Sequence, residues 1–288
     1  MIGRSGGGGE GAVGDGEECL FEGGGPGLQA RQFEVVLALA AAEMRLLLRN
    51  RTAVMSSVLL PLAVVAAVGA ITVSNGGTVD GPGLVASAFG VTLTFVTFYN
   101  LVTTFVARRE ELVLQRMRTG ELTDAEVLVG TAVPTLLVTV VQVVLVAVGV
   151  VALGYWSPPA DVVLPLVALL GGGALMVVLA AVSTSFTRTV EAAQFTTMPL
   201  VLTATMLSGL LIPLSDFPEQ VASVARFLPL TPVIELSRLG LVGETWDGQA
   251  VDTAGAWAAS PLPLAVLAGW LVGAALLARV VFRWAPRR

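Results

Sequence analysis

Lysine and histidine are both missing from this sequence, because all 16 basic residues are arginine. Without lysine, the chain cannot form a phosphate-binding loop of the GxxxxGK[ST] type. Without histidine, it has neither a histidine-based zinc site nor a Ser-His or Cys-His nucleophile. The single cysteine, Cys19, cannot form an internal disulfide. We therefore expect no catalytic residue, no metal site and no directly bound cofactor.

Charged residues are scarce, at 13% of the 288, whereas hydrophobic residues make up 55% and the mean hydropathy is +0.83. Such a chain has too little polar surface to close a water-soluble globule. Its apolar runs recur along the sequence and are long enough to cross a bilayer, which takes about 20 residues in a helix. These features predict an all-α polytopic membrane protein with six transmembrane helices, near 52–73, 84–107, 127–153, 162–185, 192–214 and 262–278.

Two segments precede the first span. Residues 1–30 are rich in glycine and acidic side chains and have almost nothing apolar to bury, which predicts a disordered tail. Residues 31–51 have apolar side chains on one helical stripe and charged ones on the other, as expected for an amphipathic helix at the membrane surface. The alternative is a soluble leader that runs into the first span. We take 31–288 as one transmembrane domain.

The arginines predict the orientation. Placing the amino terminus inside leaves only Arg226 and Arg238 of the 16 arginines on the outer side. Positive residues concentrate in cytoplasmic loops. Both termini are therefore expected in the cytoplasm, in a multi-pass protein of the plasma membrane, here a bacterial inner membrane.

The outer loop before the last span has its own pattern. Asp216 can cap a helix with Pro218 in its first turn, residues 228–232 break that helix, and 233–241 form a second one. Both pieces are half apolar, which favours a helix pair that re-enters the outer leaflet with protein covering its backbone breaks. An ordinary solvated loop is the alternative.

A charged segment, VARREELVLQRMRTGELTDAEVLVG (106–130), separates the second and third spans. Its charges have both signs, and acidic residues contribute little to orientation. The segment is therefore either a solvated, orientation-fixing loop or a short helix that forms a docking surface for a soluble partner. The charged residues taken as candidates are Arg108, Arg109, Glu110, Glu111, Arg116, Arg118, Glu121 and Glu126.

Two segments resemble a known family. RREELVLQRMRTGELTDAEVLVG (108–130) is similar to the segment between the second and third spans of ABC transporter type-2 permeases, the drug-exporter group that includes daunorubicin-resistance permeases. SGLLIPLSDFPEQVASVARFLPLTPVIELSRLGLVG (208–243) is similar to that family's outer helices after the fifth span. With the interfacial helix and six spans, the resemblance covers roughly 31–285.

The resemblance implies a half-channel that pairs with a second permease copy or paralogue and with cytoplasmic ATPase subunits that bind ATP and Mg. Residues 108–122 would be the coupling helix in an ATPase groove, with Glu110 at its acidic position and Glu126 and Gly130 opening the third span. Two positions depart from the family pattern: Leu112 and Val113 replace a small pair, and Glu121 replaces a frequent proline. These departures concern the docking contacts.

Transport of an amphipathic small molecule, drug or lipid out of the cytoplasm is the expected function, with no nucleic-acid partner. Uncharged polar residues within the spans are candidates for the path, although each could instead bond within its own helix or to a neighbour. An ion-coupled carrier is disfavoured because we find no ionisable residue within the spans, and a membrane hydrolase because a general base is missing. A non-transporting membrane anchor remains an alternative. The candidate path residues are Thr94, Thr97, Asn100, Gln142, Thr196 and Thr203.

Overall fold

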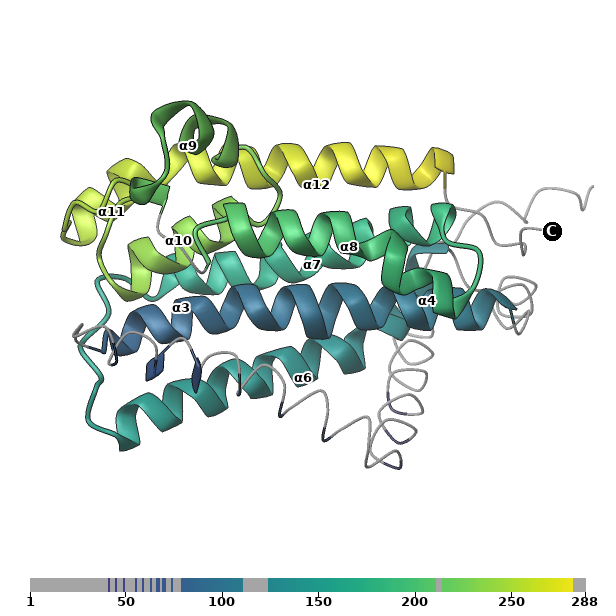
Figure 1. Cartoon of the computed structure of the whole chain (residues 1–288), viewed down its shortest axis with the longest axis horizontal. Helices are drawn as coiled ribbons and strands as arrows, with labels where there is room; N and C mark the ends of the chain where they lie inside the picture. The colour runs from purple at the N-terminus through teal and green to yellow at the C-terminus, as the bar shows by residue number, and fades with distance from the viewer. Residues whose placement is uncertain are drawn as a thin grey trace, which may run out of the picture.

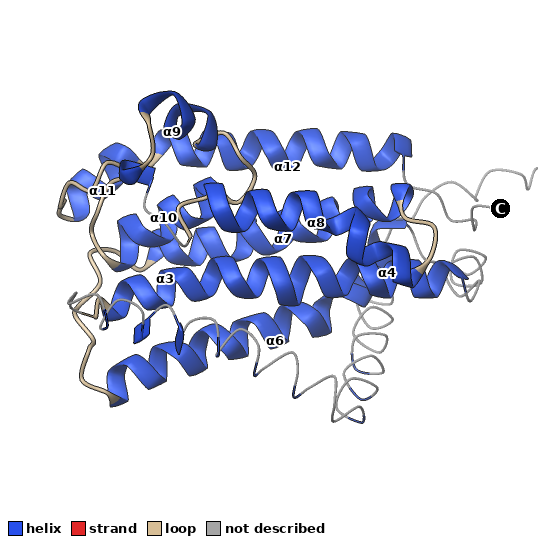
Figure 2. Ribbon diagram, in the orientation of Figure 1, coloured by secondary structure: helices blue, strands red, loops and turns tan. Residues whose placement is uncertain are grey.

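The computed structural model describes residues 79–110, 124–210 and 214–281, together with scattered positions between 41 and 74. These residues are helical almost throughout (Figure 2), and within them the one strand-like feature is an isolated bridge between Glu244 and Ala250. The predicted tail (1–30) lies outside the described residues. So do the amphipathic helix (31–51) and the first span (52–73), apart from the scattered positions.

Four helices in the described residues are long and apolar enough to cross a membrane, and they correspond to the predicted second, third, fourth and sixth spans. They lie side by side along the long axis of the molecule (Figure 1). The first is continuous from Gly81 to Glu110, although its middle turns widen into a π-helix. The elements are α3 (Gly81–Val91), η1 (Thr92–Tyr99), α4 (Asn100–Glu110), α6 (Asp124–Ala152), α7 (Val163–Phe186) and α12 (Pro261–Val281).

The predicted fifth span corresponds to α8 (Val190–Leu207), which is shorter than the sequence suggested. The helix ends at Leu207 rather than near 214, and Gly209 just beyond it has a φ of 80°. Glycine adopts this left-handed conformation without the steric cost that other residues meet. With Glu191 and Gln194 in its first turns, α8 is also less apolar than the four helices above.

Helix α7 occupies the middle of the bundle and contacts α4, η1, α10 and α12. Close backbone approach explains part of this packing. At Gly240 of α10 (Thr231–Leu241), a Cβ would lie 2.2 Å from the Pro165 ring of α7, so only glycine fits there. Leu175 and Met176 of α7 are fully buried, together with Phe98 and Phe105 of the neighbouring helix.

The predicted pair of loop helices is present, as α9 (Glu219–Ala225) and α10, with a break between Arg226 and Leu230. The predicted cap was wrong, since the N-cap residue of α9 is Pro218, and Asp216 ends the short 3-10 turn η2 (Leu214–Asp216). Every residue of α10 except Arg238 is buried. Because protein covers its backbone, α10 meets the physical requirement for a helix that re-enters a bilayer.

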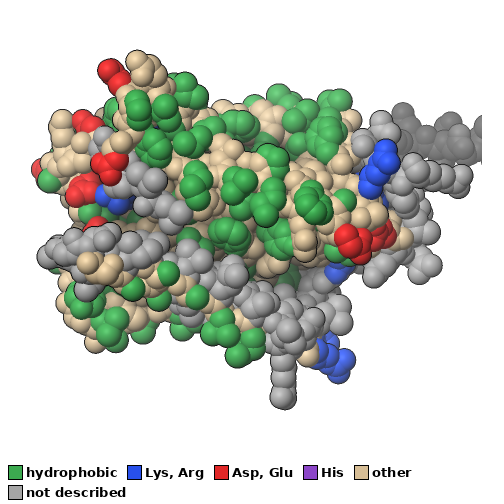
Figure 3. Space-filling view, viewed as in Figure 1, with side chains coloured by type: hydrophobic (Ala, Val, Ile, Leu, Met, Phe, Trp, Pro, Cys, Tyr) green, Lys and Arg blue, Asp and Glu red, His purple; other side chains and the backbone are tan. Residues whose placement is uncertain are grey.

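A third short helix, α11 (Thr253–Ala259), was not predicted and leads into α12. It lies with α9 and α10 at one end of the bundle, which we call the α10 end; α4 and α12 finish at the opposite end, the α4 end (Figure 1). Figure 3 shows hydrophobic side chains spread over the middle of the visible face, with charged side chains towards the two ends. This distribution suits a bilayer that surrounds the middle of the bundle.

Candidate functional sites at the two ends of the bundle

Arg109 joins the end of α4 to the end of α7. Its side chain is only 1% exposed. The Nη1 atom donates a hydrogen bond of 2.8 Å to the carbonyl oxygen of Thr184, and Nη2 donates one to the carbonyl oxygen of Thr187. Both carbonyls lie at the C-terminal end of α7, where the last carbonyls of a helix have partial negative charge. The Thr184 carbonyl also accepts the backbone N–H of Thr187 at 3.2 Å. The guanidinium therefore satisfies and neutralises this helix end.

The same contact reaches the start of α8. Thr187 is followed by a short turn in which the Thr189 side chain caps α8, accepting a hydrogen bond of 3.2 Å from the backbone N–H of Ala192. Because Arg109 holds the carbonyl of Thr187, it fixes α4 to the joint between α7 and α8. The last turn of α4 is therefore fastened to the end of α7 and to the turn that leads into α8, just before residues 111–123.

The predicted docking residues are only partly covered by the structure. Arg108, Arg109 and Glu110 form the last turn of α4, where Arg108 is half-buried and Glu110 is exposed. Glu126 belongs to the first turn of α6, but its side chain is outside the described part. Their role in docking stays a prediction. Four further candidates lie outside the described residues: Glu111, Arg116, Arg118 and Glu121.

Three of the predicted path residues are buried inside the helix bundle, where η1 packs against α6. The hydroxyls of Thr97 and Thr139 are 2.7 Å apart, and Thr139 also donates to the carbonyl of Thr135 at 3.1 Å. A threonine has a single hydroxyl hydrogen, so Thr97 must be the donor in the pair. Thr94 and Gln142 are each three residues from this pair on their own helices, and both are fully buried. We call these side chains the polar seam.

The remaining path candidates are less buried. Thr196 and Thr203 on α8 are half-buried and donate to the carbonyls of Ala192 and Pro199, at 2.9 and 2.6 Å. Asn100 is also half-buried, at the start of α4. A single copy of the chain thus has these residues in three places: the buried seam, the start of α4 and the partly exposed face of α8. Whether they line a path stays a prediction.

At the α10 end, a cavity of about 160 Å³ lies between the end of α8, η2, α10 and the residues that follow α10. We call it the α10-end pocket. Its lining combines charged, aromatic and aliphatic side chains, including Glu235, Arg238, Glu244, Trp246, Leu214 and Ile234.

Two ion pairs belong to this region. Arg226 Nη2 lies 2.9 Å from Glu235 Oε1, and the Glu235 side chain is only 5% exposed. Arg238 pairs with Glu244 at the rim, where both side chains are about one third exposed. Burial raises the pKa of the Glu235 carboxyl, while Arg226 opposes that shift by hydrogen bonding and charge. The guanidinium of Arg226 also lies 4.1 Å from the Trp246 ring centroid.

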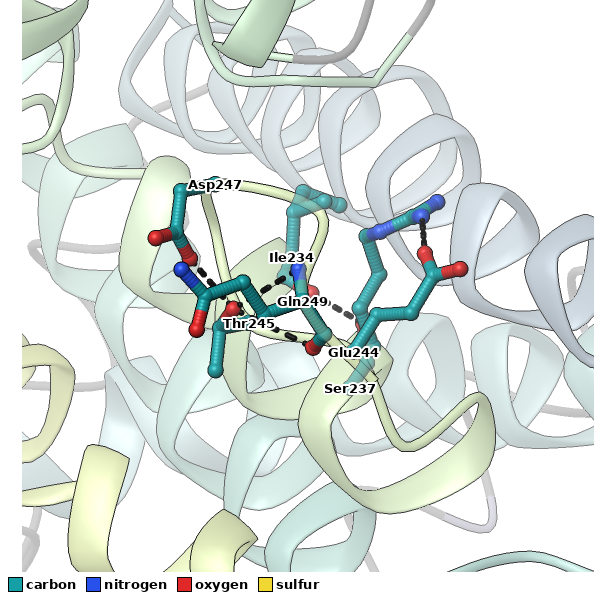
Figure 4. Close-up of polar contacts among 7 residues, drawn as sticks. Ile234, Ser237, Glu244, Thr245, Asp247 and Gln249 are labelled. Carbon is teal, nitrogen blue, oxygen red and sulfur yellow. Dashed lines mark hydrogen bonds and ion pairs between the residues drawn. The ribbon is translucent and has the colours of Figure 1, made fainter. Parts of the chain in front are cut away.

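The wall of the pocket is a tight turn closed by hydrogen bonds. Thr245 Oγ1 donates to the carboxylate of Asp247, and the Thr245 N–H donates to the carbonyl of Gln249 at 2.9 Å (Figure 4). Gly248 has a φ of 79°, which this turn requires. The turn therefore holds the Asp247 carboxylate, while Glu244 is held by its ion pair with Arg238.

Sequence reasoning assigned Arg226 and Arg238 only to the outer side and did not find this pocket. A usable signal was present, since Glu235 stands among the apolar residues that begin α10. A buried carboxylate requires a cationic or hydrogen-bonding partner, and Arg226 is the first arginine upstream of it.

The family comparison agrees with this architecture. The family described as ABC-2 type transporter matches residues 34–242, well over half of the chain, and the match ends directly after α10. No curated protein sequence matches the chain closely. On the strength of the family match, and of helices long enough to cross a bilayer, the chain is a membrane permease that belongs to the ABC-2 type transporter family.

Proposed function

We propose that the chain is the membrane subunit of an ATP-driven exporter that moves an amphipathic small molecule, drug or lipid out of the cytoplasm. A separate cytoplasmic subunit binds and hydrolyses ATP with Mg, and the permease works as a pair with a second copy or a paralogue. The observation that carries the proposal, beyond family membership, is the Arg109 joint between α4, α7 and α8.

This joint gives the proposed coupling a mechanical route. Residues 111–123 connect the end of α4 to the start of α6, so a subunit that pushes on them pushes on two helices. Through Arg109, the displacement of α4 also acts on the end of α7 and the turn before α8. Packed helices transmit such displacement because protein interiors are close to crystal density and compress little.

The proposed orientation puts the α4 end in the cytoplasm of a bacterial cell and the α10 end outside the inner membrane. Arg108, Arg109, Arg188 and Arg279 belong to the helices and turn of the α4 end. Positive residues near span ends favour the cytoplasmic side.

The proposed path lies between the two permease copies. Several helices leave large apolar side chains exposed in a single copy, among them Leu202 and Met206 of α8 and Leu276 of α12. Such faces meet either lipid or the partner copy. The half-buried hydroxyls of Thr196 and Thr203 are next to this apolar surface on α8, which suits a substrate with both apolar and polar parts.

The proposal is tested by asking whether an ATPase subunit co-purifies with the full chain. We expect a tagged chain, purified from its own membranes after mild crosslinking, to retain a nucleotide-hydrolysing subunit with vanadate-sensitive activity. Glu110→Arg reverses an exposed charge at the start of the predicted docking segment, residues 108–122, and should reduce the retained activity about fivefold, the scale of one exposed charge contact. Glu219→Arg, an equally exposed change on α9, is the matched control.

Two results would contradict the proposal. One is the absence of any nucleotide-hydrolysing partner in the purified material. The other is substrate efflux that continues when cellular ATP is depleted but stops when a protonophore removes the ion gradient, which is the behaviour of an ion-coupled carrier.

A further inference from the structure

The α10-end pocket has room for a small chemical group. A water molecule in the liquid takes up roughly 30 Å³, so a cavity of about 160 Å³ has room for a group the size of several waters. Its wall from Glu244 to Gly248 is fixed by the Thr245 hydrogen bonds. One side of the space is therefore a turn closed by hydrogen bonds.

Negative charge predominates around it. The lining contains two carboxylates, Glu235 and Glu244, and one guanidinium, Arg238. Behind the lining lie one further group of each sign, Arg226 and Asp247, which both act electrostatically on Glu235. Each lining carboxylate pairs with one guanidinium, and the exposed Asp247 leaves the described charges with one net negative charge, which favours a cationic ligand over an anionic one.

A cationic ligand would be stabilised in this pocket in addition to the arginines already there. The Glu235 carboxylate is buried and has lost most of its hydration, so its attraction for a cation is stronger than in water. The pocket is also lined by Trp246, whose ring already accepts one cation on its face. Leu214 and Ile234 add apolar surface that an inorganic ion would leave unused.

Neighbouring surface indicates where such a ligand would come from. The short helix α9 exposes Val224, at 68%, and Phe227, two residues beyond the helix, is 58% exposed. Aromatic side chains at this end are also partly exposed, as expected at the level of lipid headgroups: Tyr155, Trp156 and Trp257. Because these apolar and aromatic side chains lie at the level of the headgroups, we expect a ligand that reaches the pocket from the bilayer surface to have an apolar part.

We propose that the α10-end pocket binds a compact ammonium group carried on an apolar body, with Glu235 and Glu244 as its anionic partners and Trp246 as its aromatic wall. Two sources supply this chemistry: the choline or ethanolamine headgroup of a phospholipid in the adjacent leaflet, and a free amphiphilic amine. The site is separate from the end of α4 that precedes residues 111–123, since α4 finishes at the opposite end of the bundle.

Calorimetric binding to the purified full chain in an uncharged maltoside micelle tests this site. The ammonium probes are hexyltrimethylammonium, as the free amine, and dihexanoylphosphatidylcholine, as the lipid headgroup. Hexyl sulfate and dihexanoylphosphatidylglycerol have the same chains without the ammonium. We expect saturable binding of at least one ammonium probe and of neither comparison compound. Binding of hexyltrimethylammonium alone assigns the site to free amines, and binding of the phosphatidylcholine assigns it to the headgroup.

Two variants locate the binding. Glu244→Gln removes a rim charge that is about one third exposed, so the fold should survive, and the affinity should fall about fivefold. Trp246→Leu should weaken binding to a similar extent. Glu219→Gln removes an exposed carboxylate outside the pocket lining and should leave the affinity unchanged.

Equal binding of hexyl sulfate, or an affinity that neither variant alters, would overturn the proposal. So would the absence of saturable binding by both ammonium probes. Neither ATP nor an ATPase subunit enters the measurement, so these results would leave the proposed transport function untouched.

Discussion

Replacing Arg109 by methionine is the most direct test of how the α4 end is held together. Methionine keeps much of the length of the side chain but has no donor for the carbonyls of Thr184 and Thr187. Both acceptors would remain buried, since Thr184 and Thr187 are themselves fully buried. The substitution therefore removes the cap of α7 without creating a large cavity.

The size of the effect follows from opposing contributions. Loss of the guanidinium donor at the buried Thr187 carbonyl costs about 1–3 kcal/mol, and at the Thr184 carbonyl, which keeps the N–H of Thr187 as a donor, it removes a charge-assisted hydrogen bond worth about 1.5–3 kcal/mol. Loss of the positive charge at the helix end costs up to about 2 kcal/mol. Methionine avoids the desolvation of a buried guanidinium, which offsets several kcal/mol. We expect a net loss of about 2–4 kcal/mol for Arg109→Met. Arg109→Lys should fall between methionine and the wild type, because a lysine reaches acceptors as a single point charge.

The loss of stability is measured by thermal unfolding of the detergent-purified protein. Unfolding is followed as the loss of the monodisperse peak in size-exclusion chromatography. A loss of that size corresponds to a midpoint lowered by about 5–10 °C. Arg188→Gln is the matched control, since Arg188 lies in the same α7–α8 turn but is exposed, and it should shift the midpoint by less than about 2 °C. If Arg109→Met were as stable as Arg188→Gln, the guanidinium could not be the cap that the geometry indicates.

Three further changes probe the packing, the polar seam and the pocket. Gly240→Ala puts a Cβ 2.2 Å from a proline ring carbon of α7 and should cost at least about 2 kcal/mol, whereas Gly149→Ala, with nothing within 4 Å, should be neutral or stabilising in the same unfolding assay. Thr97→Val and Thr139→Val should each cost about 1–2 kcal/mol but together less than the sum, as a double-mutant cycle would show; full additivity would mean that the two hydroxyls do not interact. Because burial raises the pKa of Glu235, its carboxylate takes up a proton at a higher pH than an ordinary glutamate does, so hexyltrimethylammonium binding should weaken as the pH falls through that range. Glu235→Gln should remove the weakening that begins above the pH range of an ordinary glutamate, while Glu244 remains as a partner, and binding that strengthens on acidification would contradict the assignment.

The spanning helices were predictable because a bilayer imposes one length and one chemistry on them. Runs of about 20 apolar residues in a helix cross the hydrocarbon core whatever their neighbours are. The second, third, fourth and sixth predicted spans accordingly agree with the helices of the structure to within a few residues. The C-terminal end of α8 was missed because the apolar run continues through 210–214, while the left-handed conformation at Gly209 turns the chain.

The two sites were harder to predict because each depends on partners that are distant in sequence or on the other side of a helix break. In the sequence, Arg109 stands in a charged segment that reads as a solvated loop. Its side chain is buried because it binds carbonyls about 75 residues further along the chain. The pocket needs Arg226 on one side of a break and Glu235 on the other, together with Trp246 from the turn after α10. Sequence patterns report local periodicity, and such contacts appear only when helices pack.

The continuous helix from Gly81 to Glu110 connects the two sites. One end has Arg109, and the other, α3, packs against α10. Helix α3 comes so close to α10 at Gly90 that a Cβ there would lie 2.7 Å from the side chain of Ile234, which lines the α10-end pocket. In the proposed exporter, a displacement at the docking segment would therefore reach the pocket through a single buried helix. Ammonium binding to Arg109→Met measures this link directly, and an affinity equal to that of the wild type would mean that the two ends act independently.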